Sequence, residues 1–289
     1  MAFSRNPMKR VIINADDFGL CRPVNEGIIL AHTRGLLTSA TLMANTPGFD
    51  QAVDMARAHP RLGVGLHLNF VRGRPVSPPD KIASLVGADG LFFRSAAAVV
   101  RGLFSGRIRQ EDLEREGRAQ VEKALAAGVR LSHFDSEKNI HVLPSLAGLV
   151  VKLAEAYDIR KVRFIKEYGL SASLGQSLKA WFLSLSSRLA AAKFRRAGLV
   201  IADRFYGICN SGRMTAGRLT RIFGRLRRGS AEIMVHPGFV TEELKELETT
   251  VGTYFINRYR EVELRALLDP SLAEAARRAG LQLISFHDL

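Results

Sequence analysis

The stretch Arg10–Gly19, RVIINADDFG, sets the fold class, because it joins an apolar run directly to two adjacent carboxylates. Its β-branched residues are typical of a parallel strand buried on both faces, and we predict such a strand over Arg10–Ala15. In sheets of parallel strands, the side chains that follow the carboxyl ends of the strands line the functional site. We therefore expect Asp16 and Asp17 to lie at such a site, just after the first strand.

Outward from this stretch, short apolar runs alternate with amphipathic segments along the chain. Further strands are predicted over 38–43, 62–68, 129–135, 161–165, 199–202, 232–235 and 281–286. Helices are predicted over 23–34, 49–58, 111–127, 145–157, 178–197, 216–226, 258–268 and 271–279. Seven or eight strands alternating with helices predict a single-domain α/β protein with a TIM-like (β/α) barrel. A doubly wound open sheet is the competing arrangement, but the GxGxxG motif of dinucleotide-binding sheets does not follow the first strand.

The composition is that of a globular protein and excludes several other classes. Of the 289 residues, 47% are hydrophobic and 24% charged, which excludes low-complexity disorder and collagen-like repeats. No apolar stretch reaches the roughly 20 residues that span a bilayer, and the first residues lack the apolar region of a signal peptide. The two cysteines, Cys21 and Cys209, form no CxxC pair. We therefore expect a protein of the reducing cytoplasm.

The chain is strongly basic, with 42 lysines and arginines against 28 acidic residues and a formal charge of +14. Residues 171–230 hold twelve of these basic residues and a single acid, Asp203. Such a localised excess favours an anionic partner, which could be nucleic acid, a phospholipid surface or a phosphorylated substrate. Solvated arginines without a partner are the alternative. The segment lacks aromatic residues interleaved to stack bases, so no nucleic acid is expected.

The basic helix predicted over 178–197 carries an apolar stripe at helical spacing, formed by Leu178, Trp181, Phe182, Leu185, Leu189 and Ala192. An ordinary helix of a barrel wall would pack this stripe on the core. Basic amphipathic helices with Trp and Phe on the apolar side also lie in membrane interfaces. We interpret residues from about 170 to 198 as a basic helical insertion, and we expect peripheral association with the inner, anionic face of the membrane.

Polar side chains at the strand ends supply the candidate chemistry. Two adjacent carboxylates such as Asp16 and Asp17 are costly to bury unless a cation neutralises them. A divalent cation on one and a water molecule held against the other would give hydrolytic chemistry, whereas a helix N-cap explains only one aspartate. His67 ends the third strand at the same edge. Alone it could be a core histidine, but this position favours a metal ligand.

Two further stretches carry polar residues at strand ends. The densest is SHFDSEKNIH over 132–141, where strand alternation places His133, Asp135 and Glu137 on one side. We expect a third metal ligand from this cluster. His236 precedes Pro-Gly at the end of a later strand, where it could protonate a leaving group or could be a histidine of a structural turn.

Together these stretches resemble the YdjC-like carbohydrate deacetylases, a family that includes chitooligosaccharide and hopanoid-associated deacetylases. The resemblance runs from about Lys9 to Leu289 and is specific as a set. It is carried by NADDFG at 14–19, Thr38-Ser39, GLHL at 65–68, HFDSEKNIHVLP at 133–144, DRFYG at 203–207 and EIMVHPG at 232–238. It implies one domain over residues 1–289, folded as an imperfect (β/α) barrel, that removes an N-acetyl group from an amino sugar with one divalent metal ion.

The resemblance also implies roles for single residues. Asp16 corresponds to the general base and His236 to the catalytic acid. Asp17 and His67 correspond to metal ligands.

The third ligand is where this chain departs from the family. Glu137 stands where a histidine is usual, so we expect Glu137 to bind the metal, with His141 as the next candidate. A second carboxylate favours an oxygen-preferring ion such as Mg²⁺, although a set of Asp, His and Glu also binds Zn²⁺. The other polar residues of the cluster are expected to contact the sugar: His133, Asp135 and His141.

Three classes of function remain open on the sequence. The leading one is a metal-dependent deacetylase that acts on an oligosaccharide or a lipid-linked glycan, with a homodimer as the expected assembly. The second is a glycosidase of the barrel type that uses Asp16 and Asp135 as paired carboxylates. The third is a basic membrane-surface binder without a metal.

Overall fold

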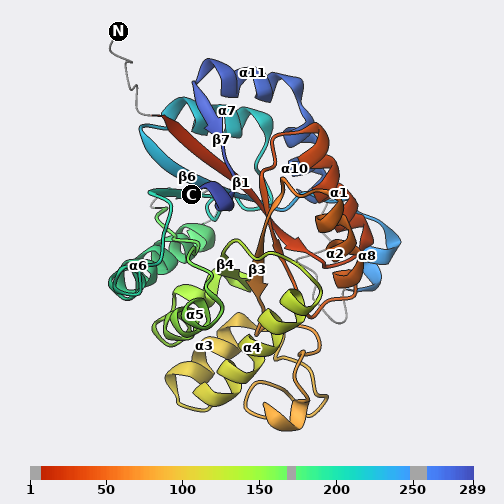
Figure 1. Ribbon diagram of the computed structural model, residues 1–289, viewed down its shortest axis with the longest axis vertical. Helices are drawn as coiled ribbons and strands as arrows, with labels where there is room; N and C mark the ends of the chain where they lie inside the picture. The colour runs from red at the N-terminus through yellow and green to blue at the C-terminus, as the bar shows by residue number, and fades with distance from the viewer. Residues whose placement is uncertain (1–7, 168–173, 248–258) are drawn as a thin grey trace.

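A parallel sheet of seven strands forms the centre of the molecule (Figure 1). The computed structural model describes residues 8–167, 174–247 and 259–289. The strands follow one another in space in the order β4-β3-β2-β1-β6-β5, and β7 pairs with β1 as well. Their bounds are β1 Lys9–Phe18, β2 Ser39–Leu42, β3 Gly63–Leu68, β4 Phe134–Ser136, β5 Arg204–Tyr206, β6 Gly229–Val235 and β7 Leu281–Leu283.

The sheet curls beyond its two ends into an incomplete barrel. Phe134 of β4 is joined by a parallel bridge to Val162, and Lys161 is joined in the same way to Val200. These bridges carry the sheet from β4 around toward β5 without forming regular strands. The imperfect (β/α) barrel predicted from the sequence is therefore confirmed, and the open doubly wound sheet is not the observed arrangement.

Helices surround the sheet (Figure 1). The α-helices are α1 Arg22–Arg34, α2 Phe49–Ala58, α3 Ala96–Phe104, α4 Gln110–Ala126, α5 Pro144–Tyr157, α6 Leu174–Arg196, α7 Ala216–Arg225, α8 Glu242–Glu246, α10 Tyr259–Leu268 and α11 Pro270–Arg278. Short 3₁₀ helices are η1 Pro79–Lys81, η2 Glu137–Val142 and η4 Phe286–Asp288. Helix α6 packs on α5, α11 packs on α7, and α1 packs on α10. None of the described helices is long and apolar enough to cross a membrane.

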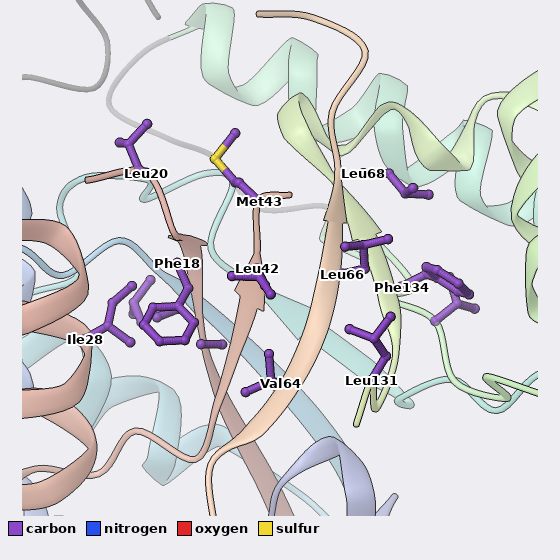
Figure 2. Packing of buried hydrophobic residues seen from close by; sticks show 14 of the residues in the cluster. Phe18, Leu20, Ile28, Leu42, Met43, Val64, Leu66, Leu68, Leu131 and Phe134 are labelled. Carbon is purple, nitrogen blue, oxygen red and sulfur yellow. The ribbon is translucent and has the colours of Figure 1, made fainter. Parts of the chain in front are cut away.

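The core fills the space between the strands and the helices. Figure 2 shows Phe18 of β1 near Ile28 of α1, while Leu66 of β3 lies near Phe134 of β4, and all four side chains are fully or almost fully buried. Each such side chain contributes roughly 1.5 to 3 kcal/mol through burial. The strand ends that carry the polar residues are therefore held by a rigid apolar layer.

Several predicted elements differ from those observed. The strand predicted over 129–135 is reduced to β4. The run 161–165 forms two isolated bridges and the run 199–202 forms one, because each bridge has only two ladder hydrogen bonds. The last strand ends at Leu283, and η4 follows. Strand β5 and helices α3 and α8 were not predicted. Helix α3 begins at an N-cap, Ser95, whose side chain accepts a hydrogen bond from the Ala98 N–H. Residues 170–173 of the predicted insertion, and Arg258, lie outside the described residues.

Candidate active site

A bulge at the end of β1 directs both aspartates into one pocket. The strand runs to Phe18, so Asp16 and Asp17 lie inside it rather than after it as predicted. The register against β2 shifts between Ala15 and Phe18, and Asp17 has a φ of 69°, in the left-handed region. Neighbours in a regular strand point to opposite faces, whereas a bulge redirects a side chain. Both carboxylates therefore line the same small cavity.

Three residues from different strand ends converge as a candidate metal centre. The Nε2 atom of His67 lies 3.8 Å from Oδ1 of Asp17 and 3.6 Å from Oε2 of Glu137. The three ligand atoms all lie within 4.8 Å of one another, and the three residues are buried. Ligand atoms around a cation with bonds of about 2.1 Å lie roughly 3 to 3.5 Å apart, so a small contraction would suffice. These are the three residues predicted as ligands.

Each of the two carboxylates keeps one oxygen for this centre. The other oxygen of Asp17 accepts a hydrogen bond from Nη2 of Arg260 at 2.6 Å. The other oxygen of Glu137 accepts one from Nε of Arg72 at 2.8 Å and lies 3.3 Å from the Lys138 ammonium. These cations hold the carboxylates in place, because each occupies the oxygen that faces away from His67.

His67 is oriented by a carboxylate on its far side. Its Nδ1 lies 2.7 Å from Oδ1 of Asp135, whose other oxygen accepts a hydrogen bond from the Thr41 hydroxyl. A proton on Nδ1 leaves the lone pair of Nε2 directed at the candidate centre, as in carboxylate–histidine–metal arrangements. Burial lowers the pKa of His67, but Asp135 and Glu137 outweigh it and raise the pKa well above its usual value. The same negative field would attract a divalent cation.

One nitrogen and two oxygens therefore make a donor set that fits a divalent cation. A second group, formed by Asp16, His67 and Asp135, is equally close-packed. It fits a cation less well, because Arg163 already binds Asp16 and Asp135, and Asp135 holds the other ring nitrogen of His67.

Asp16 is held by a fully buried arginine. Nη2 and Nη1 of Arg163 donate to Oδ1 and Oδ2 of Asp16 at 2.6 and 2.9 Å. The same guanidinium pairs with Asp135 at 2.8 Å and with Glu232 at 2.7 Å. Burial raises the pKa of Glu232 to about 7 despite this pairing. The Arg163 guanidinium thus pairs with three buried carboxylates and fixes the orientation of the Asp16 carboxylate.

His236 faces Asp16 across the pocket and is held by Glu263. Its Nε2 lies 3.9 Å from Oδ2 of Asp16. Its backbone N–H donates to Oε2 of Glu263 at 2.6 Å, and its Nδ1 lies 3.7 Å from the same oxygen. Burial lowers the pKa of His236, but Glu263 and Asp16 outweigh it and raise the pKa above its usual value. The imidazole therefore keeps its proton to a higher pH than an ordinary histidine.

The cavity itself is small and has a wider neighbour. Its volume is about 30 Å³, and it is lined by Asp16, Asp17, His67, Glu137, Lys138, Asn139, Lys179, Ile208, Ser211, Met234 and His236. A hollow of about 120 Å³ shares Ser211 and His236 with it and is otherwise lined by Gln176, Gly212, Arg213, Tyr259 and Arg260. This hollow lies directly next to the reactive groups and has polar and aromatic side chains in its wall.

The expectation that His133, Asp135 and His141 contact the sugar is wrong, because these residues are buried and do not line the cavity. His133 is fully buried, stacked on the Phe286 ring with centroids 3.5 Å apart. His141 is buried between the Ser136 hydroxyl and the Arg163 carbonyl, and burial lowers its pKa to about 4. Asp135 is fully buried behind His67. Because Asp135 has no access to the pocket, its pairing with Asp16 as glycosidase carboxylates is not supported either.

Several residues of the site were not predicted. Arg163 and Glu263 hold the two groups proposed for proton transfer, and Arg260 and Arg72 hold the two carboxylates of the metal centre. One signal was available: Arg163 interrupts the apolar run KVRFI at 161–165, where a charged residue must find a buried partner. Lys179 reaches the pocket from α6, which no motif indicated.

The fold and this site define an incomplete (β/α) barrel with a buried cluster of carboxylates and a histidine at the carboxyl ends of its strands. The family model described as YdjC-like protein matches residues 10–278, and the chain belongs to this family. A carbohydrate deacetylase of Brevibacillus brevis is 34% identical over 281 residues, which cover 97% of this chain and 99% of that protein. A human carbohydrate deacetylase is 31% identical over 309 residues, which cover 98% of this chain and 92% of that protein.

A solved structure shares the whole architecture. It is the crystal structure of a "putative cellobiose-phosphate cleavage protein" from Enterococcus faecalis V583, with a TM-score of 0.76 and 25% sequence identity. The match covers 97% of this chain and 98% of that one. The incomplete barrel is thus also found in a solved structure.

Proposed function

We propose that this chain is a metal-dependent carbohydrate deacetylase that hydrolyses the N-acetyl group of an amino sugar. The observation that carries the proposal is the convergence of Asp17, His67 and Glu137 beside Asp16 and His236, in a chain of the YdjC-like family. The curated relatives named carbohydrate deacetylase support it along nearly the full length of the chain. Asp17, His67 and Glu137 would hold the metal, and the two oxygens with one nitrogen suit Mg²⁺ or Zn²⁺.

The remaining residues divide the proton transfers between them. A divalent cation, when held by Asp17, His67 and Glu137, would supply Lewis-acid chemistry for the hydrolysis. Asp16 accepts a proton from the attacking water, whose oxygen bonds to the carbonyl carbon. The carbon–nitrogen bond then breaks, and His236 donates its proton to the departing amine. The products are acetate and a free amino sugar, and Arg163 and Glu263 act as positioning residues for the two proton carriers.

Acetate release from N-acetylated oligosaccharides and N-acetylated glycolipids tests this proposal. We expect acetate and free amine to appear in equal amounts, and we expect a chelator to abolish the reaction until Mg²⁺ or Zn²⁺ is added back. Elemental analysis of the purified protein would identify the resident ion. New reducing ends without acetate would indicate a glycosidase and contradict the proposal, as would acetate release that chelation leaves unchanged.

We further propose that the substrate is carried by a lipid and that the protein works at the cytoplasmic face of an anionic membrane. The support comes from α6, on which the apolar stripe faces solvent instead of the core. Leu178, Leu185 and Leu189 are 63%, 57% and 68% exposed, and Trp181 and Phe182 are about half exposed. An exposed apolar row of this size on one helix is unusual for a protein surface in water.

The charges around this row complement an anionic bilayer. Helix α6 has no acidic residue, and exposed Arg188, Lys193, Arg195 and Arg196 flank its apolar row. Trp and Phe anchor such helices at the level of the lipid headgroups, and anionic lipids attract the basic residues. Lys179 of the same helix lines the catalytic cavity, so a bilayer against α6 would lie close to the site. The two described cysteines, both buried and free, suit a reducing compartment.

Replacing Leu185 and Leu189 together by glutamine is expected to weaken binding to phosphatidylglycerol vesicles by at least about tenfold, because two apolar anchors are lost. Co-sedimentation at low and high salt measures the effect, and salt should weaken the wild type as well. The control replaces Phe104 and Leu125, two exposed apolar residues of other helices, and should bind as the wild type does. Absence of binding at low salt, or dimerisation through α6 in solution, would contradict membrane docking.

A further inference from the structure

A second, larger cleft lies apart from the catalytic cavity and is strongly basic. It has a volume of about 870 Å³ and lies between β5, α7 and the chain at Lys166 and Glu167. Its walls include the aromatic side chain of Tyr206 and the aliphatic side chain of Ile222. The cations that line it are Lys166, Arg204, Arg218, Arg221, Arg225 and Arg228.

The two acids of the cleft are already engaged with neutral groups. Asp203 accepts hydrogen bonds from the backbone N–H and the hydroxyl of Ser230, at 2.8 and 3.0 Å. Glu167 accepts hydrogen bonds from the backbone N–H groups of residues 207, 208 and 209. Within the described residues, none of the six cations forms an ion pair with a carboxylate. The cleft therefore has an excess of positive charge that the chain itself does not neutralise.

This arrangement costs stability unless an anion is bound. Arg218, Arg221 and Arg225 are spaced by three and four residues, so they share one face of α7, where like charges repel by a few tenths of a kcal/mol per pair. No acidic residue occurs between Arg204 and Arg228 to relieve the repulsion. Two of the guanidinium groups are fixed by backbone carbonyls: Arg204 donates to the Arg228 carbonyl at 3.0 Å, and Arg218 to the Arg213 carbonyl at 2.7 Å.

We propose that this cleft is a binding site for a phosphate group. Several guanidinium groups directed into one concave space are the usual means by which proteins bind phosphate, because each offers paired N–H donors. The segment that lines the cleft at Cys209 and Asn210 continues directly into Ser211, which lines the catalytic cavity. The site shares no residue with the candidate metal centre, so it is independent of the proposed deacetylation. Its phosphate comes from a soluble phosphate ester or from a phospholipid headgroup.

Calorimetric titration of the full-length protein with inorganic phosphate, together with co-sedimentation with phosphatidylglycerol vesicles, tests the site and separates the two sources. The variant replaces Arg221 and Arg225 by glutamine, and both side chains are exposed, so the fold should be retained. The matched control replaces Arg101 of α3 and Arg107, which follows α3, by glutamine. Both are exposed and lie outside the cleft, so the net charge changes equally.

We expect saturable phosphate binding that is about tenfold weaker in the Arg221→Gln/Arg225→Gln variant and unchanged in the control. If phosphate alone does not bind but vesicle binding falls tenfold in the variant only, the ligand is a lipid headgroup. Equal losses in variant and control would reduce the effect to net charge and overturn the proposal, as would no change in either assay. Acetate release should be the same in variant and wild type.

Discussion

Asp16→Asn is expected to lower acetate release by about a thousandfold while the bound metal stays near its wild-type content, because the amide cannot accept the proton of water. Asp17→Asn should lower both acetate release and metal content, since it removes a charged ligand oxygen from the candidate metal centre. The two residues are adjacent in the chain and both buried, so the pair of variants is closely matched. Acetate release and elemental analysis of each purified variant measure the two effects separately.

The matched control for this pair is Asp50→Asn, which changes the same side chain at an exposed position of α2 and should leave both readouts unchanged. Circular dichroism and thermal unfolding should show that the folds are retained. If Asp16→Asn lost its metal while Asp17→Asn kept it, the roles of the two aspartates would be exchanged. Wild-type rates in both variants would exclude these carboxylates from the reaction.

Local signals in the sequence predicted the barrel and placed Asp17 and His67 at strand ends, whereas Glu137 was named as a ligand only through the resemblance to the YdjC-like family. Apolar runs mark the strands, and polar residues at their ends gather at one edge of the sheet. The bulge that brings Asp16 and Asp17 into one cavity has no such signal. In the same way, η2 begins at Glu137, and Lys138 and Asn139 adopt φ values of 57° and 58°. These residues leave the strand, so strand alternation could not place them.

Contacts between residues that are far apart in the chain could not be predicted from the sequence either. His133 was expected to face the same side as Glu137, but Phe286 of η4, near the C-terminus, covers it. Arg163 reaches Asp16 across 147 positions of sequence. Such contacts depend on how the strands are ordered in space, which periodicity within one segment does not determine.

Helix α6 shows that an apolar stripe need not face the core. The sequence left two orientations open for its larger apolar residues, and in the structure smaller residues form most of the buried face. The Ser184 hydroxyl donates to the Glu167 carbonyl, and the Ser187 hydroxyl accepts from the Ile165 N–H. Small residues allow close approach of the backbones, and the two serines satisfy the backbone groups of the neighbouring segment. Side-chain size and hydrogen bonding therefore outweighed hydrophobicity in orienting this helix.

Arg163→Met is expected to destabilise the fold by about 3 to 5 kcal/mol, because it leaves buried carboxylates without their cation. The methionine side chain fills much of the same volume, so the loss reflects charge more than a cavity. Chemical denaturation at pH 7 measures it. Arg160→Met is the control: that arginine pairs with Asp158 at the surface, where an ion pair contributes about 0 to 1 kcal/mol.

The pH dependence of the unfolding free energy of Arg163→Met distinguishes the loss of charge compensation from simple misfolding. Arg163 lowers the pKa of Glu232, which burial already raises above its usual value, so without Arg163 the folded-state pKa of Glu232 should rise further. The folded state then binds more protons than the unfolded state. Stability then falls as pH rises and is partly recovered as pH falls from 7 toward 5. In the wild type Glu232, with its pKa raised to about 7, already contributes a slope of this sign.

Glu232→Gln added to Arg163→Met should recover part of the lost stability at pH 7, because one of the uncompensated carboxylates is removed. Activity should stay low in the double variant, since Asp16 still lacks the guanidinium that fixes its plane. A loss no larger than that of Arg160→Met, or a stability that does not rise on acidification, would mean that Arg163 does not balance the buried carboxylates. Recovery of stability without recovery of activity would assign Arg163 two roles: charge compensation for the core and orientation of the proton acceptor.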